Sequence, residues 1–216
     1  MLVRDLMTPE PLTIGPNSDY LAAIALMRAG RFRRLPVVDA DKKLIGIISA
    51  KDMHRSSPGA PKERALQSDG VLVRVGDIMT QPVISVPPDY PVEEAARLMA
   101  EHRIGCLPVV VDERVVGIVT DTDVFKAFIN ILGGGSQSIR VTVEVPNRPG
   151  EFAAVSSRVA AVGGNITSIA SHPGEEPGCI KLTLRVESVP LKTLTAAIQE
   201  HPDAVIRYTW DESGLS

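Results

Sequence analysis

Two short segments of the chain share one pattern of residues that can do chemistry. Each runs glycine, two apolar residues, a serine or threonine, two further residues and an aspartate, with Ser49 and Asp52 in one and Thr120 and Asp123 in the other. At a helix start, a hydroxyl and free backbone N–H groups attract a phosphate, and the aspartate can accept hydrogen bonds from both hydroxyls of a ribose. The same residues can also form a capping box, which would explain them by structure alone.

The two segments belong to a longer internal repeat. Residues 3–53 reappear at 75–124, and the apolar run Leu35–Val38 matches Leu107–Val110 at an offset of 72. Two copies are too few for an open solenoid and instead predict a pseudo-twofold pair. We expect a first repeat at 1–60, a linker at 61–73 and a second repeat at 74–132.

Each repeat is expected to fold in the order β-α-β-β-α. An extended run bounded by proline precedes an amphipathic helix, which Ser18 can cap in the first repeat. Two β-branched runs around a polar turn then predict a hairpin, and a second helix starts at Ser49 or Thr120. The predicted segments are Pro11–Ile14, Ser18–Gly30, Leu35–Val38 and Leu44–Ser49, and then Pro82–Val86, Pro91–His102, Leu107–Val111 and Val115–Thr120.

The ends of these strands predict an aliphatic pocket in each repeat that could sandwich a purine. The pocket residues are Thr13, Ile14 and Pro36 in the first repeat and Ile84, Ser85 and Pro108 in the second. Met27 and Met99 lie on apolar helix faces and Cys106 lies in an apolar strand, so we expect them to be core residues.

These landmarks, in this order and given twice, resemble a tandem cystathionine-β-synthase-type (CBS) domain pair. The resemblance covers residues 1–132 and implies a regulatory module whose clefts bind AMP, ADP, ATP or S-adenosylmethionine. It implies phosphate and ribose contacts for the hydroxyl and the aspartate of both patterned segments. It also implies phosphate contacts for the basic residues before the Leu-Pro-Val-Val strand, which are Arg33 and Arg34.

The two repeats differ in charge. The first has nine basic and six acidic residues, whereas the second has five basic and nine acidic residues. Gly105 and Cys106 stand at the positions of Arg33 and Arg34, so that only Arg103 is near, and Asp121 replaces a neutral alanine. Because a negative charge repels a phosphate, we expect the first repeat to be the better phosphate site.

The last part of the chain, residues 139–216 after a glycine-rich linker at 133–138, has a different pattern. Alternation and turn residues predict the order β-α-β-β-α-β, which is a ferredoxin-like split unit. The predicted elements are Ile139–Val145, Glu151–Val162, Asn165–Ser171, Cys179–Val186, Pro190–Glu200 and Ala204–Trp210. With the CBS pair, this makes the whole chain a mixed α/β protein of the α+β kind.

This C-terminal part resembles an ACT domain, the small amino-acid-sensing fold of biosynthetic regulators. The matching residues are Asn147, Pro149 and Gly150 after the first strand, and Asn165 and Ile166 at the start of the second. The resemblance implies an amino-acid site at these residues. Two other interpretations stay open: Pro149 and Gly150 can simply make a turn, and many domains of this kind only dimerise.

Composition excludes several function classes. The net charge is −3, which argues against nucleic-acid binding by bulk charge. No apolar run reaches the length of a membrane span, and the two cysteines are too few for a disulfide framework. The histidines have no metal-ligand spacing, and no nucleophile elbow or catalytic carboxylate pair is evident. We therefore expect a cytoplasmic protein with no metal and no catalytic cofactor.

The favoured interpretation is a non-enzymatic homodimeric regulator that senses an adenosine nucleotide and an amino acid. Its whole architecture resembles the acetoin-utilisation type of regulatory protein. The alternative is a dimerising accessory subunit of an enzyme or transporter that binds no nucleotide. Because strand edges and apolar faces remain uncovered in such small units, a homodimer is expected under both interpretations.

Overall fold

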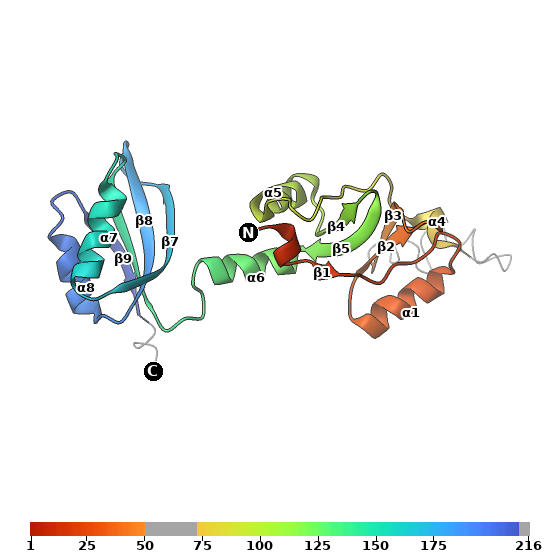
Figure 1. The fold of residues 1–216 in the computed structure, drawn as a ribbon, viewed down its shortest axis with the longest axis horizontal. Helices are drawn as coiled ribbons and strands as arrows, with labels where there is room; N and C mark the ends of the chain where they lie inside the picture. Colours follow the sequence, from red (N-terminus) through yellow and green to blue (C-terminus); the bar gives the residue numbers. More distant parts are fainter. Residues whose placement is uncertain (51–72, 212–216) are drawn as a thin grey trace, which may run out of the picture. The chain divides into compact units, whose positions relative to one another are not determined.

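The chain forms two compact units in the computed structural model, which describes residues 1–50 and 73–211 (Figure 1). The first unit runs from Met1 to Phe125, and the second begins at Lys126. The division falls inside helix α6 (Asp121–Ile131), ahead of the predicted glycine-rich linker at 133–138. The predicted domain limits stay predictions.

The first repeat contains the predicted helix and hairpin. Its elements are α1 (Tyr20–Gly30), β2 (Arg34–Val38) and β3 (Leu44–Ser49). The two strands pair antiparallel, with Arg34 opposite Ser49. The prediction that Ser18 caps α1 is wrong, because the Asp19 carboxylate accepts the hydrogen bond from the Leu21 N–H. A carboxylate at this position also complements the positive end of the helix dipole.

The second repeat folds in the same order. Its elements are α5 (Val92–His102), β4 (Cys106–Val111), β5 (Arg114–Thr120) and α6. The strands form an antiparallel hairpin in which Cys106 lies opposite Thr120. Helix α6 begins directly after Thr120, as predicted. The predicted second helix of the first repeat beyond Ala50, with Lys51 and Asp52, and the linker up to residue 72 lie outside the described residues.

The predicted extended segments before the helices are not strands in the described sheets. Each instead makes one backbone bridge at its last residue, Ile14 to Val37 and Val86 to Val109, both in parallel. Ile14 donates its N–H to the Pro36 carbonyl at 3.1 Å, and Val86 donates to the Pro108 carbonyl at 3.1 Å. Each segment begins with a proline, which removes one backbone donor at that end.

The segments that open the repeats are exchanged between them. The short strand β1 (Thr8–Pro9) belongs to the first repeat but pairs with β5 of the second, with Thr8 opposite Ile118. In return, Thr80 bridges Ile47 of β3, with N–H to O distances of 2.8 and 3.1 Å. Two short helices, η1 (Val3–Asp5) and α4 (Val75–Ile78), precede these contacts. Neither repeat is therefore a separate fold.

Two glycines make this exchange possible. A methyl group on Gly46 would overlap the side chain of Met79, and one on Gly117 would overlap the side chain of Met7. Each methionine comes from the other repeat. The glycine that opens each patterned segment is therefore required by close packing of an exchanged methionine.

Two aliphatic cores stabilise the first unit. One gathers around β2 and β3, where Leu35, Val37 and Ile48 have no exposed surface. The other gathers around β4 and β5, where Leu107 and Val109 have none. Met27 and Met99 belong to these cores, as predicted.

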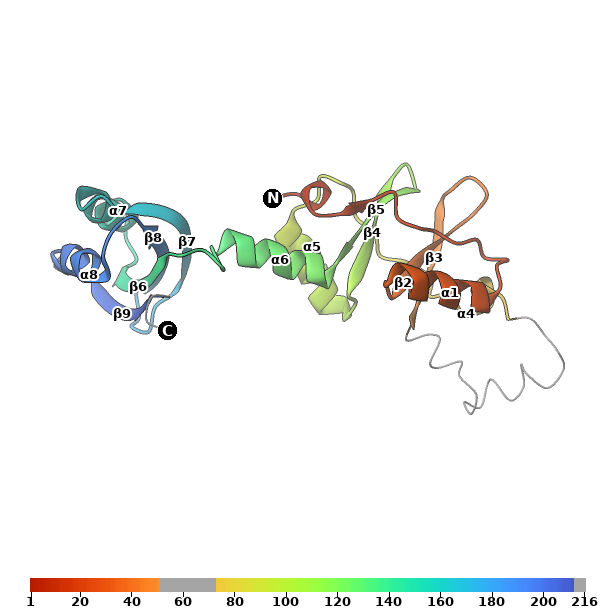
Figure 2. The same cartoon turned by 90° about the horizontal axis from the view of Figure 1, so that it is seen from below.

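The second unit is a four-stranded antiparallel sheet with two helices, a ferredoxin-like arrangement as predicted. Its elements are β6 (Ile139–Pro146), α7 (Glu151–Ala161), β7 (Asn165–Pro173), β8 (Cys179–Glu187), α8 (Leu191–Gln199) and β9 (Val205–Trp210). The strand order is β7-β8-β6-β9. Both helices lie on the same face of this sheet (Figure 2).

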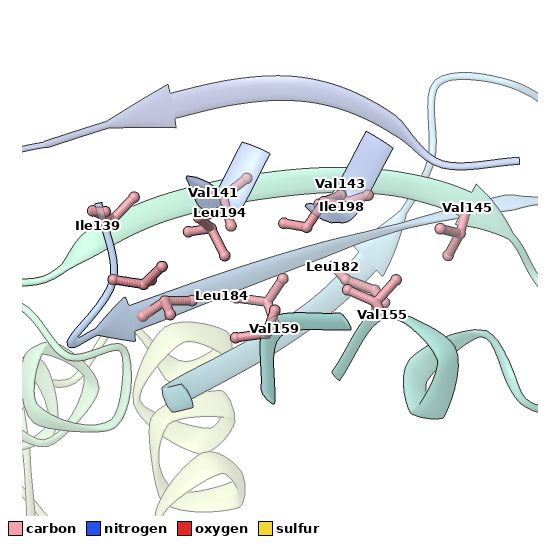
Figure 3. Close-up of a cluster of buried hydrophobic side chains, with 12 residues drawn as sticks. Ile139, Val141, Val143, Val145, Val155, Val159, Leu182, Leu184, Leu194 and Ile198 are labelled. Atoms are coloured by element: carbon pink, nitrogen blue, oxygen red, sulfur yellow. The ribbon is translucent and has the colours of Figure 1, made fainter. Parts of the chain in front are cut away.

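The core of the second unit lies between the helices and the sheet (Figure 3). Every second residue of β6 points into it, from Ile139 to Val145, together with Val155 of α7 and Ile198 of α8. All of the buried residues in this cluster are Val, Leu or Ile. Alternation in β6 therefore predicts both the strand and the buried face correctly.

The opposite face of the sheet holds a buried carboxylate. Glu144 is 3% exposed, accepts a hydrogen bond from the Glu176 N–H at 3.0 Å, and pairs with Arg207 Nε at 2.8 Å. The Glu176 N–H, and after it Arg207, lower the pKa of Glu144 below its usual value. Both partners stabilise the ionised form, which is why a charge is tolerated here.

Candidate functional site: two cavities built from both repeats

A cavity of about 540 Å³ contains the patterned segment of the second repeat. Its lining includes Thr120, Asp121 and Asp123 from the end of β5 and the start of α6. Ile118 and Thr122 also belong to the second repeat, and the rest comes from the first repeat: Thr8, Glu10, Pro11, Leu12, Gly30, Arg31, Phe32, Arg33, Arg34 and Pro36. We call this the Thr120 cavity. Its volume suits a small ligand.

A second cavity, of about 430 Å³, contains the patterned segment of the first repeat. Ser49 and Ala50 lie in its wall, and the opposite wall comes from the second repeat. That wall is formed by Thr80, Pro82, Val83, Ile84, Arg103, Ile104, Gly105 and Cys106. We call this the Ser49 cavity.

The two cavities are related by the internal repeat. Leu12 of the Thr120 cavity corresponds to Ile84 of the Ser49 cavity, and Arg31 corresponds to Arg103, both at the offset of 72. Each cavity therefore combines the strand end of one repeat with the opening segment of the other. The sequence analysis placed each site within a single repeat, whereas each cavity is lined by residues of both repeats because the opening segments are exchanged.

The turn at Thr120 has the geometry of a capping box. The Thr120 N–H and Oγ1 donate to Asp123 Oδ2 at 2.9 and 2.7 Å, and the Asp123 N–H donates to Thr120 Oγ1 at 3.4 Å. The structural interpretation of this motif is thus confirmed. It does not exclude ligand binding, because the bonds to Asp123 end on Oδ2, and Oδ1 accepts none from the residues that the structure describes.

The arginines do not divide between the repeats as predicted. Arg33 and Arg34 line the Thr120 cavity as well as the Ser49 cavity. They therefore border the first repeat's cavity, as expected, and the second repeat's cavity as well, and their phosphate contacts stay a prediction. The acidic Asp121 lines the Thr120 cavity beside them, so the charge that was expected to repel a phosphate faces cations from the other repeat.

Arg34 crosses towards the second repeat above Gly105. A methyl group at Gly105 would overlap Arg34 Nη2 and would lie 2.7 Å from Asp121 Oδ2. The missing side chain at Gly105 therefore leaves the space that both charged groups reach. The neighbouring Cys106 thiol is buried, and this burial raises its pKa to about 11. Such a thiol is protonated at neutral pH, in agreement with a packing role.

Of the other residues predicted to bind nucleotide, two line these cavities, one lines a different cavity and three line neither of the two. Pro36 lines the Thr120 cavity and Ile84 lines the Ser49 cavity. Ser85 lies instead in a cavity of about 780 Å³ at the hairpin turns, beside the Lys43–Glu113 ion pair. The last group lines neither of the two cavities, and consists of Thr13, Pro108 and the buried Ile14.

Sequence reasoning missed the residues that the exchange brings in. Thr8 and Glu10 of the first repeat, and Thr80 and Pro82 of the second, line cavities whose patterned segment is in the other repeat. Arg31 was missed as well, although its counterpart Arg103 was named. The sequence did contain a sign of these residues, because the Asp-apolar-Met-Thr segment occurs in both repeats, ahead of α1 and ahead of α5.

The predicted amino-acid site of the second unit is divided between two ends of the sheet. Asn147, Pro149 and Gly150 follow the end of β6, where Pro146 pairs with Cys179. Asn165 and Ile166 lie at the other end, where Ile166 pairs with Val186, the partner of Ile139. Seven strand residues separate the two ends, which is roughly 23 Å. One chain does not bring these residues together.

The loop after β6 is held by ion pairs of its own. Arg148 Nε contacts Glu151 at 2.6 Å and its Nη2 contacts Asp203 at 2.6 Å. Gly150 has a φ of +96°, a value that glycine adopts easily. This conformation accounts for a glycine in the turn without any ligand, which agrees with the interpretation that Pro149 and Gly150 simply make a turn.

The described part of the chain, residues 1–50 and 73–211, contains neither a metal-binding cluster nor a membrane-spanning helix. No group of three or more His, Cys, Asp or Glu residues there could hold a metal ion. No described helix is long and apolar enough to cross a membrane.

Comparison with known proteins identifies the family of the first unit. The family model for the CBS domain matches residues 3–59 and 75–130, which are the two repeats. The chain belongs to the CBS-domain family. An uncharacterized protein of Methanocaldococcus jannaschii is 32% identical over 155 residues, which cover 60% of this chain and 92% of the relative.

Solved CBS structures resemble the same part of the chain. A Vibrio cholerae protein (AcuB), assigned provisionally to acetoin utilization, is 36% identical with a TM-score of 0.53, covering 62% of this chain and 93% of that one. The CBS domain pair of protein MJ0100, with 5′-methylthioadenosine and S-adenosyl-L-methionine, is 32% identical with a TM-score of 0.52, covering 60% and 97%. CBSX2 in complex with AMP is 30% identical with a TM-score of 0.52, covering 60% and 97%.

Two other relatives match in different ways. A second uncharacterized protein of Methanocaldococcus jannaschii is 29% identical over 209 residues, or 91% of this chain, and the chain spans about half of its length (48%). The L-aspartate semialdehyde sulfurtransferase of the same organism is 33% identical over 128 residues, or 59% of this chain but 23% of the enzyme. The match therefore covers less than a quarter of that enzyme.

Proposed function

We propose that this CBS pair binds adenosine nucleotides in the Thr120 and Ser49 cavities and that the protein acts as a regulator without catalysis. One observation carries the proposal: each cavity combines a hydroxyl at a strand end with arginines, and with aliphatic side chains that come from the other repeat. Solved CBS pairs that are 30% and 32% identical contain AMP or S-adenosylmethionine, which supports the same ligand class here.

The residues of the Thr120 cavity have distinct roles in this proposal. Asp123 accepts hydrogen bonds from the ribose hydroxyls, because its Oδ1 faces no donor among the described residues. Thr120 and the arginines bind phosphate, and Leu12 and Pro36 contact the purine. In the Ser49 cavity, Ser49, Arg103 and Ile84 take the corresponding positions. Asp52 is proposed from the repeat alone.

Calorimetric titration of the full chain with AMP, ADP, ATP and S-adenosylmethionine tests the proposal. We expect saturable heat with at least one of them. Ligand should also raise the melting temperature by mass action. If none of the four gives saturable heat at millimolar concentration, the proposed function is wrong.

The signal would be transmitted through the arrangement of the two repeats. Because each cavity is walled by both repeats, a ligand binds better to one arrangement than to another and shifts the population towards it. A partner protein would then recognise the favoured arrangement. Relatives that consist of little more than CBS repeats, such as the one matched over 92% of its length, support a role without a fused catalytic domain.

One observation favours the alternative, an accessory subunit that assembles without nucleotide. Large apolar side chains are exposed, with Phe125 of α6 at 68% and Leu21 of α1 at 62%. Exposed apolar residues of this size are typical of protein contacts. Light scattering at micromolar concentration tests the proposed homodimer, and an assembly subunit would give a dimer but no nucleotide heat.

For the second unit we propose an amino-acid site that a second chain completes. Asn147, Pro149 and Gly150 lie roughly 23 Å from Asn165 and Ile166 along one sheet, so these two groups can meet at one ligand only between chains. Thermal shift with the twenty amino acids tests this. If none stabilises the protein, the unit serves for assembly alone.

A further inference from the structure

We infer that the two cavities share Arg33 and Arg34, and that they therefore bind phosphorylated ligands with negative cooperativity. The inference rests on the proposed function and adds a coupling between its two sites. It starts from a departure from the internal symmetry. By the offset of 72, the positions of Arg33 and Arg34 are taken in the second repeat by Gly105 and Cys106, which carry no charge.

The arginines of the first repeat make up for this missing pair. Both line the Thr120 cavity, and the internal repeat places Gly105 and Cys106 at the corresponding positions of the Ser49 cavity. Arg33 and Arg34 also line that second cavity, beside these two uncharged residues. The Arg34 guanidinium occupies the space above Gly105 that any side chain would fill. The backbone of Arg34 lies opposite Ser49 in the hairpin. Its side chain is thus placed between the two cavities.

The remaining cations are not shared. Arg31 lines the Thr120 cavity alone, and its counterpart Arg103 lines the Ser49 cavity alone. Among the described lining residues, each cavity thus has one arginine of its own. The Thr120 cavity also contains Glu10, Asp121 and Asp123, so the shared arginines are needed there to balance the acidic groups.

One guanidinium can hold one phosphate in a bidentate contact at a time. A nucleotide in either cavity would turn the shared arginines towards its own phosphates. A second nucleotide would then meet fewer available donors and the charge of the first phosphate at short range. The coupling should grow with phosphate charge and vanish for adenosine, which has no phosphate. By linkage it acts equally in both directions.

Two matched variants isolate the single cavities. Leu12→Trp fills the Thr120 cavity, and Ile84→Trp fills the Ser49 cavity at the corresponding position. Neither substitution replaces an arginine. For independent sites, the product of the two wild-type dissociation constants equals the product of the two single-cavity constants. The factor by which the wild-type product exceeds the product of the single-cavity constants is the coupling factor.

We expect a coupling factor of at least about 5 for ATP, a smaller one for AMP, and a value near 1 for adenosine. Arg34→Met removes one of the two shared arginines, so it should lower the ATP factor while it weakens both sites. Arg31→Asn and Arg103→Asn, which keep a residue that tolerates positive φ, should each weaken one cavity and leave the factor unchanged. Circular dichroism of every variant checks that it folds.

Calorimetric titration separates the outcomes. An ATP factor near 1 in the wild type would overturn the coupling and leave the proposed function intact. The same holds if Arg34→Met leaves a large factor unchanged. If none of AMP, ADP, ATP and S-adenosylmethionine gives saturable heat, the proposed function fails and the coupling fails with it.

Discussion

Asp123 can be tested for two roles at once, because its two possible functions need different atoms. Its Oδ2 accepts hydrogen bonds from Thr120 at 2.9 and 2.7 Å and so caps α6. A ribose would use the carboxylate charge and the second oxygen. Asp123→Ala removes both functions. Asp123→Asn keeps one oxygen for the cap but replaces the other by an NH₂ donor and removes the charge.

The structure sets the expected magnitudes. Loss of the cap in Asp123→Ala should lower the free energy of unfolding by about 1 kcal/mol, or the melting temperature by roughly 2–4 °C for a chain of this size. Asp123→Asn should lose less than half of that. Hydrogen bonds to a charged acceptor are worth about 1.5–3 kcal/mol each, so both variants should weaken ATP binding at the Thr120 cavity by a factor of about 10 to 150.

Thermal melts without ligand and calorimetric titration with ATP measure the two effects separately. Asp19→Ala is the matched control, because Asp19 caps α1 through the Leu21 N–H and lines neither cavity. It should lose stability but keep its ATP affinity. If Asp123→Asn binds ATP as tightly as the wild type, the ribose role is refuted. If Asp123→Ala melts like the wild type, the capping argument is wrong.

Three further outcomes follow from packing and charge. Gly46→Ala should destabilise the first unit by about 1–3 kcal/mol, and Met79→Ala in the same chain should recover part of that loss in urea unfolding; additive effects would contradict the exchange of segments. Because burial raises the pKa of Cys106 to about 11, iodoacetamide at pH 8 should alkylate the half-buried Cys179 first, which peptide mass mapping can check. The pKa of Glu144 is lowered in the fold, so its stabilisation is present above its unfolded pKa and is lost as pH falls through the folded one. Glu144→Gln should accordingly flatten the acid limb of the stability–pH curve, and an unchanged limb would count against the pairing.

The order of elements in both units could be predicted because each rests on local pattern. Alternation identifies β6 and its buried face, and β-branched runs around polar turns identify both hairpins. Helix limits also agree closely: the predicted Pro91–His102 is observed as Val92–His102, since Pro91 is the cap. Such features depend on neighbours within a few residues, which a sequence displays directly.

The partner of each strand could not be predicted in the same way. β1 is two residues long and exposed, so its periodicity carries no information about which hairpin it joins. Its pairing with β5 is decided by tertiary packing, chiefly the fit of Met7 over Gly117. The sequence therefore identified the residues at the strand ends, but it did not show which opening segment lies across from them in each cavity. Asn147 and Asn165 were grouped in one site for the same reason, because a motif does not show at which end of a sheet its residues lie.

The exchange of segments has a consequence for how a signal could arise. If each repeat held its own site, a ligand would stabilise one repeat and leave its relation to the other unchanged. Here Thr120 and Asp123 face Arg33 and Arg34 across the boundary between repeats, so a ligand that contacts both sides acts on that boundary directly. Differential affinity for two arrangements is the requirement for a ligand-driven switch. A site built across the two repeats meets it, because any change in their spacing changes the distance between the hydroxyl and the arginines.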